Sequence, residues 1–181
     1  MEILKLKKMS VKELCTVAML VAITVILSYI SGYLRIGPIS KFNISFISVY
    51  IAGAAFGPWI GGLVAAMADV VSFLANPTGP FMPWFTVIEF AGGFLFGLIL
   101  FRGKGERSRL NFVLRVVLCV VLQYLVNIIR TYMLAELYYG GKFLVTFVSR
   151  IPSTTIMAAV KIAALLLIEP FMDNIMRLTK S

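Results

Sequence analysis

Four ionisable side chains interrupt long apolar stretches of this chain, and they are the residues best suited to polar chemistry. They are Asp69, Glu89, Arg130 and Lys161. A charged side chain at mid-membrane depth costs about 2.5–3.5 kcal/mol on insertion scales, so it is expected to face a partner or a wet cavity. Two interpretations stay open: these residues pair to hold helices together, or they line a shared ligand site.

A polar stripe surrounds one of these residues. Gln123, Asn127 and Arg130 follow one another at intervals of four and three residues, and Thr131 lies four beyond Asn127. Such spacing places side chains on one face of a helix. We predict that Asn127 and Arg130 contact a ligand.

Basic and aromatic residues gather next to the ends of the apolar stretches. They are Arg35, Lys41, Arg150, Phe81, Trp84 and Phe85. Flat rings and guanidinium groups together suit a planar heterocycle that carries carboxylates. The alternative for Trp84 is a place in the aromatic belt at the membrane interface.

Other chemistry lacks the residues that it needs. The chain has no histidine, and its two cysteines, Cys15 and Cys119, fall inside apolar runs, which argues against a zinc site and a disulfide. No phosphate-binding loop, HExxH motif or GxSxG elbow occurs. We therefore predict a protein that is not an enzyme and that needs no cofactor or metal.

The composition indicates an all-α, polytopic membrane protein with one domain over residues 1–181. Of 181 residues, 60% are apolar and 14% are charged, and the mean hydropathy is +0.96. Apolar stretches near 20 residues predict transmembrane helices. We expect six spans, with loops at 31–41 and 138–150, and both Gly57-Pro58 and the proline-rich stretch 76–83 as breaks. The expected spans are 14–33, 43–56, 59–74, 84–101, 112–137 and 153–171.

The distribution of basic residues predicts the orientation. With six spans, the termini and the break at 102–109 share one side, which carries eleven Lys and Arg when Arg115 is included, against four on the other side. The positive-inside rule then places both termini in the cytoplasm, in the cell membrane. The same rule explains the net charge of +9, because the basic residues gather beside the ends of the apolar stretches. We therefore do not expect nucleic acid as a partner.

Ala18 and Ala22 form a small-xxx-small pair in the first apolar stretch. Small residues four apart lie on one helix face and allow another backbone to come close. The pair is either a docking face for a partner or ordinary packing in a membrane helix.

The chain resembles the substrate-binding S components of energy-coupling-factor (ECF) vitamin transporters, and most of all their folate-type branch. The strongest motifs are FGPWIGG at 56–62, Ala68-Asp69 and PTGPFMPWFT at 77–86. Supporting motifs are Leu34-Arg35-Ile36, Asn43-Ile44-Ser45-Phe46, Asn127 with Arg130-Thr131, and Arg150-Ile151-Pro152.

The resemblance implies a six-helix fold that binds a vitamin near the outer surface, with folate as the expected ligand. It implies three partner subunits, one transmembrane coupling subunit and two cytoplasmic ATPases, with Ala18 and Ala22 in the first-helix docking motif. The chain departs from the family pattern at Trp84, usually Gly, and at residues 87–89, usually small. These departures favour a different vitamin as the alternative. Two rival functions are a stand-alone secondary transporter that uses Asp69 and Glu89, and an intramembrane enzyme.

Overall fold

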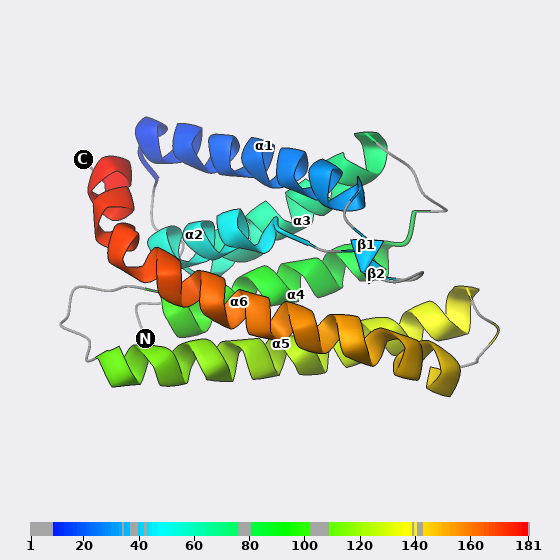
Figure 1. Ribbon diagram of the computed structural model, residues 1–181. Coiled ribbons are helices and arrows are strands. Elements are labelled where there is room, and N and C mark those ends of the chain that lie inside the picture. The colour runs from blue at the N-terminus through cyan, green and yellow to red at the C-terminus, as the bar shows by residue number, and fades with distance from the viewer. Residues whose placement is uncertain are drawn as a thin grey trace.

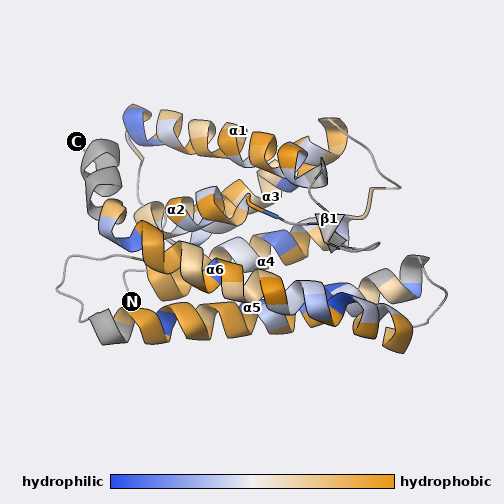
Figure 2. Ribbon diagram, in the orientation of Figure 1, coloured by the Kyte–Doolittle hydropathy of each residue, from blue (hydrophilic) through white to orange (hydrophobic). Residues whose placement is uncertain are grey.

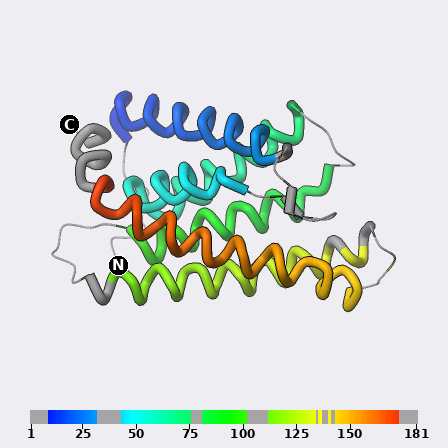
Figure 3. Tube along the Cα trace, in the orientation of Figure 1, coloured from blue at the N-terminus to red at the C-terminus, as the bar shows by residue number. Residues whose placement is uncertain are grey.

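Six helices and one small hairpin make up the computed structural model, which describes residues 9–33, 35–36, 40–41, 43–75, 81–101, 109–138, 140 and 143–180. The elements are α1 (Val11–Tyr33), β1 (Arg35–Ile36), β2 (Ser40–Lys41), α2 (Phe46–Phe56), α3 (Pro58–Ala75), α4 (Pro83–Leu100), α5 (Arg109–Tyr138) and α6 (Phe143–Lys180). Successive helices run in opposite directions along one bundle (Figures 1 and 3). The all-α expectation is confirmed.

Five of the helices are long and apolar enough to cross a membrane, namely α1, α3, α4, α5 and α6. The apolar helix α2 has 11 residues, which span only about 16 Å at 1.5 Å per residue. The segment expected as a second full span is therefore too short to cross the hydrocarbon core alone. Hydrophobic residues run along the whole length of the helices, broken by single hydrophilic turns (Figure 2).

The last helix differs most from expectation. It begins at Phe143, so most of the loop expected at 138–150 is the first part of α6. Pro152 and Pro170 both lie inside this helix. Proline usually ends or kinks a helix, so a span that starts at 153, after Pro152, was the expectation.

The loop expected at 31–41 contains the end of α1 and the two-residue hairpin strands, which pair antiparallel.

Local sequence signals explain two of the helix boundaries. At the start of α1, the backbone N–H of Ser10 donates to the Glu13 carboxylate at 2.8 Å, as in a capping box. Gly57 ends α2 with φ of 99°, a conformation that favours glycine, and its N–H donates to the Gly53 carbonyl. Pro58 then opens α3, where a first-turn residue needs no N–H donor.

Glycines bring α2, α3 and α4 into backbone contact. A Cβ placed on Gly53 would lie 2.7 Å from the backbone nitrogen of Gly97, and one on Gly61 would lie 2.7 Å from the carbonyl oxygen of Gly93. These three helices therefore pack through their backbones, as small residues allow in membrane helices.

The main apolar core lies between α2, α4, α5 and α6. Its largest fully buried side chains are Tyr50, Phe96, Phe112, Leu100, Leu165 and Met172. Tyr50 and Phe96 meet edge to face, with ring centroids 6.0 Å apart. On α4, α5 and α6 this core occupies the half of the bundle near the α2–α3 turn, away from the hairpin (Figure 1).

Candidate functional site

The inward faces of three helices change from apolar to polar along their length. On α4, Glu89 lies four, seven and eleven residues before the buried Gly93, Phe96 and Leu100. Residues at these intervals share a helix face. Glu89 therefore faces the bundle interior, in the half nearer the hairpin.

The same change occurs on α5 and α6. On α5, Arg130 lies eleven residues after the buried Cys119 and fourteen after Val116, on the same face. On α6, Lys161 lies four residues before Leu165 and eleven before Met172. All three helices thus present apolar residues to one half of the interior and charged residues to the other half.

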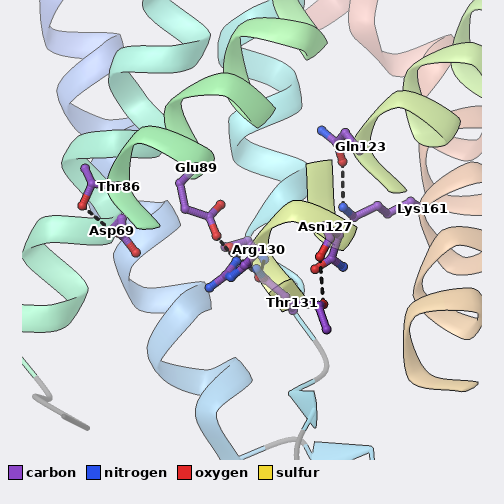
Figure 4. Close-up of polar contacts among 10 residues, drawn as sticks. Asp69, Thr86, Glu89, Gln123, Asn127, Arg130, Thr131 and Lys161 are labelled. Carbon is purple, nitrogen blue, oxygen red and sulfur yellow. Dashed lines mark hydrogen bonds and ion pairs between the residues drawn. The ribbon is translucent and has the colours of Figure 1, made fainter. Parts of the chain in front are cut away.

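An ion pair joins α4 and α5 in the polar half. Arg130 donates from its guanidinium to the Glu89 carboxylate (Figure 4). The guanidinium also lies over the Phe85 ring, with its central carbon 5.6 Å from the ring centroid. The side chains of Arg130 and Glu89 remain 37% and 31% exposed. The ion pair is therefore only partly covered by the rest of the protein.

A second polar chain links α6, α5 and α4. The Lys161 ammonium donates to the Gln123 side-chain oxygen at 2.7 Å (Figure 4). The Gln123 amide donates in turn to the Gly92 carbonyl at 3.2 Å. Lys161 also lies over the Phe46 ring at 5.7 Å. Within the described part of the chain, Lys161 makes no ion pair, so its hydrogen-bond partner is a neutral amide.

Asp69 is hydrogen-bonded to the next helix, α4. The Thr86 hydroxyl donates to the Asp69 carboxylate at 2.7 Å, which joins α3 to the first part of α4. These two residues belong to separate motifs of the sequence, AD at 68–69 and PTGPFMPWFT at 77–86. The contact gives Asp69 a structural role; its ligand contact stays a prediction.

Two small hollows lie between α5 and α6 in the polar half. The larger has a volume of about 30 Å³ and is lined by polar residues that include Gln123, Asn127, Thr154 and Lys161. The smaller, of about 10 Å³, is lined by Asn127, Thr131, Arg150 and Thr154, among others. Volumes of this size hold roughly one or two water molecules.

The three predicted aromatic contacts lie in different settings. Phe85 is partly buried beneath Arg130, as described above. Phe81 contacts Phe73 with the two rings tilted by 54° and their centroids 5.1 Å apart, near the end of α3 and the start of α4. Trp84 is 61% exposed and has no ring partner among the described residues.

The remaining predicted ligand residues are only partly described. The backbones of Arg35 and Lys41 pair across the hairpin, but their side chains lie outside the described residues. Arg150 and Asn127 line the smaller hollow together.

Ala18 and Ala22 are both exposed on α1, whereas Val17, Leu20 and Thr24 are buried on its other face. The alanine pair therefore faces away from the polar interior, and its docking role stays a prediction.

Gln123, Thr154 and Lys161 line the larger hollow, although they were not among the site residues predicted from the sequence. The signal for them was present. Gln123 belongs to the polar stripe with Asn127 and Arg130, and Lys161 is a charge at mid-membrane depth.

Charged and polar side chains inside a bundle of apolar helices are the usual mark of a functional site in a membrane protein. Residues 12–171 match the family described as "ECF transporter, substrate-specific component", and the chain belongs to this family of non-enzymatic transport proteins. The family works with ECF module partners.

Two curated relatives carry the name folate transporter FolT. The chain is 31% identical to that of Clostridium novyi (strain NT), over 66% of this chain and 67% of the relative. It is 29% identical to that of Streptococcus mutans serotype c, over 79% and 77%. A crystal structure of FolT bound with folic acid superposes with a TM-score of 0.73 at 27% identity, over 87% of this chain and 93% of that one.

Proposed function

We propose that this chain binds folate, or a closely related carboxylated heterocycle, at the outer side of the cell membrane and delivers it to an ECF module. One observation carries this proposal: the inward faces of α4, α5 and α6 turn from apolar to charged in the same half of the bundle. The similarity to two proteins named folate transporter supports the choice of ligand.

The proposed ligand contacts divide by chemistry. Arg130 and Arg150 bind carboxylates, since guanidinium groups match carboxylates with paired hydrogen bonds, and Arg35 and Lys41 add positive charge at the hairpin. Phe85, with Phe81 and Trp84 nearby in sequence, offers ring surface to the heterocycle.

Hydrogen-bonding groups of the larger hollow suit the polar edge of such a heterocycle. Asn127 and Lys161 lie there with Thr154, and each offers at least one donor.

We place both termini in the cytoplasm and the polar half outside. Two facts support this orientation: the excess of eleven Lys and Arg over four, and the shared end of the bundle at which α1 begins and α6 ends (Figure 1). The partners in this proposal are a transmembrane coupling subunit, which docks on Ala18 and Ala22, and two cytoplasmic ATPases.

The rival proposal of a stand-alone transporter assigns cation transport to Asp69 and Glu89. Asp69 accepts a hydrogen bond from Thr86, and Glu89 forms an ion pair with Arg130. Both acids thus already have partners from the protein, which supports the binding-subunit proposal over the rival.

The test is titration of the purified chain with folic acid, followed by fluorescence or calorimetry. Loss of one charge-assisted contact, of about 1.5–3 kcal/mol, predicts that Arg130→Ala weakens binding by roughly 10–100-fold. Arg115→Ala is the matched control, because Arg115 lies on the same helix and is exposed. Equal affinity of the wild type and Arg130→Ala would remove Arg130 from the site, and no binding by any of them would overturn folate as the ligand.

A further inference from the structure

We infer that Glu89 competes with a carboxylate of the ligand for Arg130 and thereby sets how strongly the site prefers anionic ligands. This inference rests on the proposed function.

Geometry places Glu89 where a ligand carboxylate would bind. Arg130 directs its guanidinium to Glu89, and the Phe85 ring, four residues before Glu89 on α4, lies beneath it. Both charged side chains are about a third exposed. The ion pair is therefore not sealed off by the protein, and an incoming carboxylate can approach the guanidinium.

The local charges make the competition consequential. Among the described residues, the polar half holds four charges on α3 to α6, the cations Arg130 and Lys161 and the acids Asp69 and Glu89, and Arg150 adds a third cation beside the smaller hollow. Asp69 interacts with the Thr86 hydroxyl, whereas Glu89 pairs with Arg130 and also attracts Lys161 at longer range. Removal of the Glu89 charge would leave this group of four with a net positive charge.

Ligand binding then exchanges one carboxylate partner of Arg130 for another. Such an exchange yields a smaller net gain than binding to a free guanidinium, because the new ion pair replaces an existing one. Without the Glu89 charge, the same ligand would meet an unpaired guanidinium, and its carboxylate would gain a full charge-assisted hydrogen bond.

The experiment compares Glu89→Gln with the wild type for folic acid and for pterin, which has no carboxylate. We expect Glu89→Gln to bind folic acid about 10-fold more tightly and pterin within about twofold of the wild type. Glu136→Gln is the matched control, because it makes the same change at an exposed position on α5. In an Arg130→Ala background the gain from Glu89→Gln should be smaller than in the wild type, since only the direct repulsion between Glu89 and the ligand remains to be relieved.

Each outcome decides the inference. Equal or weaker folic acid binding by monodisperse Glu89→Gln, or an equal gain for pterin, would overturn it. If Glu89→Gln cannot be purified, Glu89→Asp weakens the ion pair by its shorter side chain and should still bind folic acid about threefold more tightly. Failure of the wild type and all variants to bind folic acid would instead overturn the proposed function.

Discussion

Arg130 contacts two residues that lie one helical turn apart on α4, Phe85 and Glu89. Side chains four residues apart share a helix face, so one turn of α4 provides both an acid and a ring to the guanidinium. In the proposed site, the carboxylate of a ligand replaces Glu89 at the guanidinium, and a flat ring of the ligand packs beside Phe85. We therefore expect this turn of α4 to determine the specificity for the ligand.

Two neighbouring aromatic residues test which ring serves the ligand. Phe85 is partly buried under Arg130, and Trp84 is 61% exposed. We expect Phe85→Ala to weaken folic acid binding by roughly tenfold, and by more than Trp84→Ala does, because a stacked ring contributes about 0.5–1.5 kcal/mol beyond its buried area. Titration of both variants measures this. A larger loss for Trp84→Ala would show that the indole moves onto the ligand.

At the scale of the helices, contacts at glycines determine how closely α3 and α4 pack. A Cβ on Gly93 would overlap the Gly61 carbonyl oxygen and lie 2.8 Å from the Cβ of Ala65, whereas a Cβ on Gly92 would meet only the Gln123 amide at 4.0 Å. Overpacking of this kind costs about 1–3 kcal/mol. Gly93→Ala should therefore lower the melting temperature by roughly 2–12 °C.

Gly92→Ala is the control for that prediction, because it adds the same methyl group one residue away. Fluorescence-detected size-exclusion after heating gives both melting temperatures. Equal stability of the two variants would mean that α3 and α4 separate without cost, which contradicts packing through the backbones.

The exposed alanine pair on α1 makes a second prediction at this scale. Ala18→Trp with Ala22→Trp should abolish ATP-driven uptake by cells with an ECF module, because indoles prevent close backbone approach. Folic acid binding by the isolated variant should stay within about twofold of the wild type. Ile23→Trp is the control, because Ile23 is exposed on the same helix but lies about 100° around the helix axis from Ala22. A parallel loss of binding would show that the pair packs inside the protein.

The elements were predictable from sequence to different degrees. Apolar length predicted α1, α3, α4 and α5 closely. The predicted start of α6 was wrong because Pro152 usually marks a helix boundary, whereas here it lies inside the helix. The site was predictable as a set of charges, since a charge at membrane depth must face inward. Contacts between particular residues, such as the hydrogen bond from Gln123 to Gly92, depend on how each helix is rotated and how closely the glycines let the helices approach. Neither can be read from one sequence.

The whole molecule divides into a closed apolar half and a polar half. The apolar half holds Phe96, Phe112, Val116 and Leu165 with little exposure. In the proposed orientation this half separates the ligand from the cytoplasm. Transport then requires a change driven by partners, because a protein moves between states only through differential interactions with them.

The most direct test of this account is uptake by liposomes that contain only the purified chain. Labelled folic acid is added under an imposed proton or sodium gradient, with gradient-free liposomes as the control. We predict saturable binding that never exceeds the number of protein molecules and does not respond to either gradient. Gradient-driven accumulation of folic acid inside these liposomes would contradict the account and favour a stand-alone transporter.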